Sequence, residues 1–345
     1  MNEISLVSID LAKRVFQVEA SDASGRRLWE RRVWREELVA LIGSLPATTI
    51  AMEACATAHH WGRLFSAMGH KIQLIPPPAV SRLVDRRKKN DRSDTRAIRK
   101  AAGDEDVRAV PLKSLQSQAE QFEHRVREQW VNQRTATINQ LRAMLSEFGI
   151  VLPKGAGVLL SRRAELLADG RLAGMDRLKR LMEAQFDLLE RLSTMINEAD
   201  RRLRQLARTS PVARRLTSIP GVGPVISTAM PAAVPDAKAF ANGRAFAASL
   251  GLVPSQHSSG QTVRLGPITK RGSRYLRANL VHGARSLLTR VKRGAAEPSD
   301  GLMLWAKSLL GRMPWNKAVV AVANKLARII WALMANGGLY RPRPA

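Results

Sequence analysis

The sequence contains few acidic residues and almost no cysteine. Its 345 residues include 29 Asp and Glu against 56 Lys and Arg, so the formal net charge is +27. A charge of this size predicts a polyanionic partner, either nucleic acid or an acidic membrane surface. Cys55 is the single cysteine, which excludes disulfides within the chain and zinc sites built from cysteines. We expect Cys55 to be a small buried hydrophobe in a reducing cytoplasm.

Long apolar runs are also missing. The nearest candidate, residues 318–334, is interrupted by Asn324, Lys325 and Arg328, whereas a membrane span needs about 20 apolar residues. The N-terminus lacks a basic region followed by an apolar core, so we expect no secretory signal. A hydrophobic fraction of 45% excludes a disordered chain and is enough for two or three packed domains.

The first hundred residues predict a mixed α/β fold. Alternating apolar residues predict strands over residues 4–9, 16–20, 27–33, 48–52 and 71–75, with helices near residues 36–45 and 60–65. Three strands followed by alternating helix and strand is the order of an RNase H-like sheet. Asp10 ends the first apolar run and Glu53 ends the fourth.

Two further carboxylates lie in a basic segment. Asp91 and Asp94 are three residues apart, so they share one face if a helix begins there. Four carboxylates around one point repel one another unless divalent cations lie between them, and such oxygen sites suit Mg²⁺ or Mn²⁺. Two such ions can activate an attacking oxygen and stabilise a leaving one, which predicts phosphodiester chemistry. Each Asp alone is more commonly a helix cap or a solvated loop residue.

The densest basic segment runs directly into this acidic pair. It consists of Arg86, Arg87, Lys88, Lys89 and Arg92. These side chains could hold a nucleic-acid backbone without reading sequence, although such runs are usually solvated. Acidic residues 104–106 and Pro111 mark the end of the first domain, residues 1–106.

Two long helical patterns follow and predict a second domain over residues 112–208. The first has an apolar face of Phe122, Val126, Ile138, Leu141, Leu145 and Phe148. The second approximates a heptad seam of Leu178, Leu181, Leu188, Leu192, Met195, Ala199 and Leu206. A helical hairpin within one chain and a dimeric coiled coil explain this pattern equally well.

Residues 210–345 form the predicted third domain, which we expect to be mostly helical. Gly221 and Gly223 lie in a segment like a helix-hairpin-helix turn, whose backbone N–H groups could approach a phosphate; a steric turn between helices is the alternative. A serine-containing loop, residues 251–260, precedes the basic residues Arg264, Lys270, Arg271, Arg274 and Arg277. Serine is a weak nucleophile unless it is activated, and most such loops are only turns.

Tryptophans recur in the C-terminal helical segments. Trp305, Trp315 and Trp331 could stack on unpaired bases, whereas core packing is the usual role of this residue type.

Several short motifs together resemble one family. They are Ser8-Ile9-Asp10 with Lys13, Met52-Glu53-Ala54, Asn90-Asp91-Arg92-Ser93-Asp94, Arg134-Thr135 to Gly149, Pro220-Gly221-Val222-Gly223-Pro224, and Gln256-His257-Ser258-Ser259-Gly260 leading to Lys270-Arg271-Gly272. Over nearly its whole length the chain resembles DEDD-type insertion-sequence transposases, which join a RuvC-like N-terminal domain to a C-terminal serine transposase domain and include the Piv-type invertases.

The resemblance implies roles that spacing does not. Asp10, Glu53, Asp91 and Asp94 would be the DEDD metal ligands, and Ser259 would be the nucleophile that attaches to a DNA end, with Ser258 as the second candidate. Such proteins use a structured guide RNA, called a bridge or seeker RNA, that pairs with donor and target DNA. They form dimers that pair into tetramers at a synapse, in a bacterial, nucleoid-associated cytoplasmic location.

Three other functions stay open. A plain RNase H-like endonuclease or junction resolvase would use metal-activated water, and Ser259 would only shape a loop. A nonenzymatic RNA- or DNA-binding protein would explain the charge but not the ordered carboxylates. A tyrosine recombinase would need Tyr275, which lies between Arg274 and Arg277, but the chain lacks other signals of that fold.

Overall fold

The computed structural model describes residues 3–84, 91–153, 155–258, 262–294 and 300–342, and for residues 91, 92 and 156 it describes the backbone alone. The chain divides into two compact units. The first contains Met1–Ser117 and Val234–Ala241, and the second contains Gln118–Ala233 and Asn242–Ala345. The division into domains 1–106, 112–208 and 210–345 stays a prediction.

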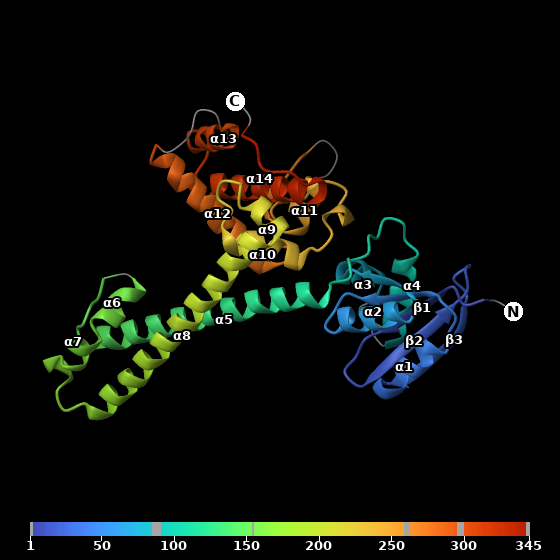
Figure 1. The fold of residues 1–345 in the computed structure, drawn as a ribbon, viewed down its shortest axis with the longest axis horizontal. Coiled ribbons are helices and arrows are strands. Elements are labelled where there is room, and N and C mark those ends of the chain that lie inside the picture. The colour runs from blue at the N-terminus through green and yellow to red at the C-terminus, as the bar shows by residue number, and fades with distance from the viewer. Residues whose placement is uncertain (1–2, 85–90, 154, 259–261, 295–299, 343–345) are drawn as a thin grey trace. The chain divides into compact units, whose positions relative to one another are not determined.

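A five-stranded mixed sheet forms the centre of the first unit (Figure 1). The elements are β1 (Leu6–Asp10), β2 (Val15–Ser21), β3 (Arg27–Trp34), α1 (Arg35–Gly43), β4 (Thr49–Glu53), α2 (Ala58–Ala67), β5 (Lys71–Ile75), α3 (Pro77–Leu83) and α4 (Asp91–Ala102). The strand order is β3-β2-β1-β4-β5, with β1, β2 and β3 antiparallel and β1, β4 and β5 parallel. This mixed α/β architecture is consistent with the predicted RNase H-like fold.

The two faces of the sheet are covered by different helices. Helices α1 and α2 pack on one face, where residues such as Ile9, Met52 and Phe65 form a buried core. Helices α3 and α4 cover the other face, where Ala51 and Ile75 pack against Ile98. Because strand residues alternate between faces, this second face is the one to which Asp10 and Glu53 belong.

In the part of the second unit that the structure describes, the regular elements are helices and one short hairpin. Its elements are α5 (Leu115–Glu147), α6 (Ala156–Ser161), α7 (Arg163–Leu167), η1 (Gly170–Leu172), α8 (Asp176–Thr209), α9 (Pro211–Leu216), α10 (Pro224–Ala233), α11 (Gly243–Ser249), β6 (Pro254–Gln256), β7 (Leu265–Ile268), α12 (Arg274–Lys292), α13 (Gly301–Leu310) and α14 (Trp315–Asn336). A further short helix, η2 (Ala237–Ala239), belongs to the first unit.

Helices α5 and α8 run antiparallel and pack within the chain (Figure 1). Ion pairs join Arg127 to Asp200 and Glu123 to Arg202 near one end, and Leu141 packs with Phe186 in the core near the other. Part of the predicted α5 face is wrong, because Phe122 is 66% exposed and the buried residue there is His124.

The predicted heptad seam of α8 is also partly wrong. Leu181 and Leu188 are 58% and 42% exposed, whereas Met182, Phe186 and Leu189 are buried. The inward stripe therefore contains Leu192 and Ala199 of the predicted seam, but in the first half of the helix it passes through the residues next to Leu181 and Leu188. The outer leucines are left at the surface of α8.

Two further expectations are corrected. Cys55 is exposed, because it lies in the turn between β4 and α2 rather than in the core. Helix α14 is long and apolar enough to cross a membrane by length and composition alone. This is weak evidence of a span, because a core helix passes the same test, and Val322 and Leu326 of α14 are buried in the second unit.

Candidate active site

Asp10 and Glu53 occupy neighbouring strand ends. Strands β1 and β4 are parallel, with Ile9 opposite Met52, so the next residue of each strand is one of the two carboxylates. Both are partly buried. Burial raises the pKa of the Cys55 thiol, and the negative charges of Glu53 and Asp10 raise it further. Both carboxylates therefore lie within electrostatic range of one thiol, which brings these two predicted site residues together.

Helix α4 carries the other two acidic residues, and Asp94 lies on its sheet-facing side. Ala97, Ile98 and Ala101 are buried against the sheet. Asp94 precedes them by three, four and seven residues, so it lies on the same helical face, and it is partly buried. Asp91 lies one further turn towards the start of α4. The helix thus directs Asp94 towards the sheet face that bears Asp10 and Glu53.

A buried ion pair fixes α4 on this face. The Arg99 Nε atom lies 2.6 Å from Oε1 of Glu19 in β2, and the Glu19 side chain is only 2% exposed. Arg99 also donates a hydrogen bond to the carbonyl of Gly25. Sequence reasoning did not find this pair. The available signal was the polar alternation of Gln17, Glu19 and Ser21 along β2, which places all three on the face under α4.

Ser8 is a second residue that the sequence did not single out. It alternates with Asp10 along β1, and its buried Oγ atom has no hydrogen-bond partner within the described residues. Asp10, Glu53, Asp94 and Ser8 belong to one side of the sheet, and their oxygens are of the kind that a hard divalent cation binds. Among the described side chains, no three His, Cys, Asp or Glu residues are grouped closely enough to hold an ion. The side chain of Asp91 lies outside that set.

The predicted phosphate-binding segment before α4 is mostly outside the described residues. This holds for Arg86, Arg87, Lys88 and Lys89, and for the side chain of Arg92. Their contact with nucleic acid stays a prediction.

The basic residues of the second unit have two different environments. Arg264, Lys270, Arg271 and Arg274 are exposed, as phosphate contacts require. Arg277 instead donates hydrogen bonds from Nη1 to the carbonyls of Leu250, at 3.0 Å, and Arg271, at 2.8 Å. Arg277 therefore stabilises the crossing of two backbone segments.

The serine-containing loop is supported by a small hairpin. Strands β6 and β7 pair antiparallel, and the exposed Ser258 lies beyond β6. The Ser258 Oγ accepts hydrogen bonds from Gln256 Nε2 at 3.0 Å and from the Arg264 backbone N–H at 3.3 Å. Ser259 lies outside the described residues. Its predicted role as nucleophile rests on the resemblance.

The two glycines of the turn between α9 and α10 have different surroundings. Gly221 has a φ of +85°, and a Cβ atom there would lie 2.8 Å from the carbonyl oxygen of Gly283 in α12. This close approach explains Gly221 by packing alone. Gly223 has open space around it, so it is the better candidate of the two for a phosphate contact.

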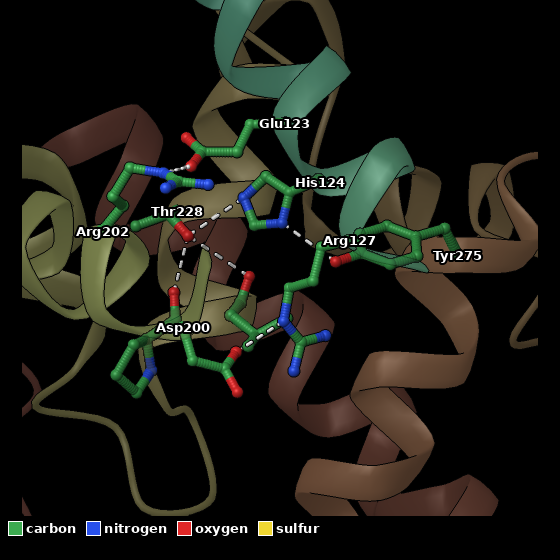
Figure 2. Close-up of polar contacts among 9 residues, drawn as sticks. Glu123, His124, Arg127, Asp200, Arg202, Thr228 and Tyr275 are labelled. Atoms are coloured by element: carbon green, nitrogen blue, oxygen red, sulfur yellow. Dashed lines mark hydrogen bonds and ion pairs between the residues drawn. The ribbon is translucent and has the colours of Figure 1, made fainter. Parts of the chain in front are cut away.

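A polar network that the sequence did not predict joins α5, α10 and α12 (Figure 2). His124 Nδ1 lies 2.9 Å from the Tyr275 hydroxyl, and His124 Nε2 lies 3.0 Å from Thr228 Oγ1. The Thr228 hydroxyl donates its proton to the Pro224 carbonyl at 2.6 Å. Thr228 Oγ1 therefore accepts the His124 Nε2 proton, and Nδ1 accepts the proton of Tyr275.

The titration properties of this network follow from its burial. Burial lowers the pKa of His124 to about 4, and the positive charge of Arg127 acts in the same direction. Burial raises the pKa of Tyr275 to about 12. The Tyr275 hydroxyl is thus protonated and engaged with a neutral histidine, which disfavours it as the nucleophile of a tyrosine recombinase.

Family profiles match both parts of the chain. A DEDD transposase profile of the IS110 type matches residues 7–150, which include Asp10, Glu53, Asp91 and Asp94. A profile of the IS116/IS110/IS902 transposase family matches residues 213–298, which include the serine-containing loop.

Full-length relatives agree with these profiles. The chain is 38% identical over 340 residues to a probable family 20 transposase of Pseudomonas aeruginosa, covering 98% of this chain and 99% of that protein. It is 38% identical over 341 residues to the transposase for insertion sequence element IS1111A of Coxiella burnetii, covering 99% and 92%. It is 34% identical over 340 residues to the transposase for IS1328 of Yersinia enterocolitica, covering 99% of each chain.

Proposed function

Because the chain belongs to the IS116/IS110/IS902 family of insertion-sequence transposases, and is therefore a DNA transposase, we propose that it cuts and rejoins DNA through a transient serine–DNA bond. Asp10, Glu53, Asp91 and Asp94 hold Mg²⁺ or Mn²⁺, and Ser259 is the nucleophile. The carboxylates come from the first unit and the serine from the second, so the active site is composite. It is formed within one chain or between two chains.

One observation carries the acidic part of this proposal. Asp10 and Glu53 end adjacent parallel strands, and α4 directs Asp94 towards the same face. The buried Ser8 hydroxyl has no hydrogen-bond partner among the residues that the structure describes, and it adds an oxygen on the same face of β1 as Asp10. Carboxylate and hydroxyl oxygens are ligands of hard cations. Bound ions would polarise the scissile phosphate and stabilise the charge that develops on its oxygens.

Side chains of this protein would carry out the transfer and neutralise the phosphate charge. A bond forms between the Ser259 Oγ and the phosphorus, and the bond from that phosphorus to one deoxyribose oxygen breaks. The serine loses its proton, and the departing deoxyribose oxygen gains one. Attack by the hydroxyl of another strand reverses these changes and releases the serine. The exposed cations Arg271 and Arg274 are placed next to this loop in the sequence and would neutralise charge on the phosphorane.

The partners follow from the charge and from the resemblance. A net charge of +27 exceeds what a short DNA contact needs, and it is compatible with a structured guide RNA that base-pairs with donor and target DNA. The exposed leucines of α8 support a homo-oligomer, a dimer that pairs into a tetramer at the synapse. A cytoplasmic, nucleoid-associated location would follow from such partners.

Denaturing electrophoresis of labelled DNA tests the serine step. Protein, copurified RNA, DNA and Mg²⁺ are incubated, and we expect a protein-linked DNA product that Ser259→Ala abolishes and Ser258→Ala retains. Cleavage that yields a free 3′-OH and 5′-phosphate without linkage would identify the nuclease instead. Asp10→Asn with every activity intact would indicate a nonenzymatic binding protein.

Sequencing of the RNA that copurifies with the protein tests the guide. We expect one abundant structured RNA whose loops match donor and target DNA. A preparation that is active and free of RNA would refute guidance by RNA.

A further inference from the structure

A cavity of about 1010 Å³ lies within the second unit. Its walls come from α13, α14, the start of α11 and residues 339–341. Trp305, Trp331 and Tyr340 supply aromatic side chains, and aliphatic side chains form much of the remaining wall. None of the acidic or serine residues assigned above lines it.

The charged residues that line this cavity all have one sign. Arg244, Lys325, Arg328 and Arg341 all line it, and no Asp or Glu does so within the described part of the chain. The ammonium of Lys325 lies over the Trp305 ring, 5.7 Å from its centre, so this cation and this ring form a cation–π pair in the cavity wall. This composition predicts a ligand that is anionic and carries a flat, apolar ring.

The C-terminal wall of the cavity is held by specific contacts. The Tyr340 hydroxyl donates a hydrogen bond to Asp300 Oδ1 at 2.8 Å, and its backbone N–H donates to Ser218 Oγ at 2.9 Å. Asp300 is only 4% exposed and caps the start of α13. Burial and the Asp300 carboxylate raise the pKa of Tyr340. These two hydrogen bonds fix the position of Tyr340 and so keep this side of the cavity ordered.

We propose that this cavity binds one unpaired nucleotide of a DNA strand. Aromatic side chains and cations are the two features that single-strand sites combine, because bases stack on the rings and phosphates bind the cations. A base inside a duplex is already stacked on its neighbours, and it must leave that stack to lie against the aromatic side chains of a protein pocket. The volume matches the upper end of small-ligand sites, at roughly 1,000 Å³. The site takes no part in the bond-breaking steps proposed above.

Photocrosslinking locates the nucleotide. A DNA duplex with a single unpaired 5-iododeoxyuridine is irradiated with the full-length protein, and the linked peptides are identified by mass spectrometry. We expect crosslinks in peptides that contain Trp305, Trp331 or Tyr340. A fully paired duplex with the same base is expected to give none there. Crosslinks confined to other parts of the chain would overturn the assignment.

Binding measurements with matched variants test the contacts. Loss of one base–aromatic stack is expected to weaken binding of a short oligo(dT) about 5- to 150-fold in Trp331→Leu. Arg328→Gln removes a cation without disturbing a ring, and should weaken the same binding. Trp315→Leu and Lys317→Gln, on the same helix but outside the cavity, are the controls and should change it less than about 2-fold.

The remaining outcomes separate this site from its alternatives. Equal weakening of single-strand and duplex binding in Arg328→Gln would overturn the proposal. So would oligo(U) that binds while oligo(dT) does not, or a Trp331→Leu defect confined to phosphatidylserine vesicles. Asp10→Asn should abolish cleavage and keep the crosslink, so failure of the metal site and failure of this cavity give different results.

Discussion

The ion pair between Arg99 and Glu19 makes a strong prediction about how the acidic site is held. Arg99→Met keeps most of the side-chain volume but leaves the Glu19 carboxylate buried without its cation, at 2% exposure. Breaking a buried pair by removing one partner costs about 3–5 kcal/mol, because the remaining charge stays desolvated. Since whole domains are stable by only about 5–15 kcal/mol, α4 should detach from β2 far more often.

Hydrogen–deuterium exchange measures this effect locally. Amide protection in β2 and α4 should fall roughly 100- to 4000-fold, since each 1.4 kcal/mol is a factor of ten. The double variant Glu19→Gln with Arg99→Met removes both charges and should recover most of the protection. DNA cleavage should fall in the single variant, because Asp94 is carried on the same helix.

The exposed Arg96 on the same helix provides the control. Arg96→Met should leave protection unchanged. A loss of less than about 1 kcal/mol in Arg99→Met would be the behaviour of a surface ion pair. That result would refute the role of Arg99 in fixing α4.

Three other predictions follow from single positions. The free energy of unfolding should decrease as the pH falls from 6.5 towards 4, because folding lowers the pKa of His124 from 6.5 to about 4, so that the unfolded state binds the proton more readily. Urea midpoints at pH 7.5 and 5 measure this decrease, and His124→Gln should remove part of the pH dependence. Gly221→Ala should cost about 1–3 kcal/mol through its positive φ and its approach to α12, whereas Gly223→Ala should be nearly neutral in thermal melts. Leu189→Ala should cost about 2–5 kcal/mol and Leu188→Ala less than about 1 kcal/mol in urea unfolding, and equal losses would contradict the orientation of α8.

The places of Asp10, Glu53 and Asp94 on their strands and helix were predictable because they follow from local periods, whereas their joint role in binding metal stays a prediction. Alternation along β1 and β4 decides which way Asp10 and Glu53 point, and the helical period decides that Asp94 shares a face with Ile98. Each period needs only a few neighbouring residues. The pair of Glu19 and Arg99 was not predictable in this way, because its members are separated by 80 residues and meet only when α4 packs on β2.

The network around His124 was not predictable from the sequence for a related reason. His124 meets Thr228 and Tyr275 across gaps of 104 and 151 residues, and no period within α5 connects them. A histidine at an otherwise apolar helical position was the only local signal. That signal does not identify its partners. Phe122, which hydrophobicity alone placed on the buried face of α5, is 66% exposed.

Helix α8 shows why its apolar pattern predicted a helical hairpin within one chain and a dimeric coiled coil equally well. Apolar residues occur there in adjacent pairs at heptad spacing, Leu181 with Met182 and Leu188 with Leu189. Neighbouring helical residues lie about 100° apart, so these pairs generate two apolar stripes rather than one. The stripe through Met182 and Leu189 is buried against the chain itself, while the leucines of the other stripe stay exposed. A hairpin within the chain therefore buries only one of the two apolar stripes of α8, and the exposed Leu181 and Leu188 are compatible with the homo-oligomer proposed above, which stays a prediction.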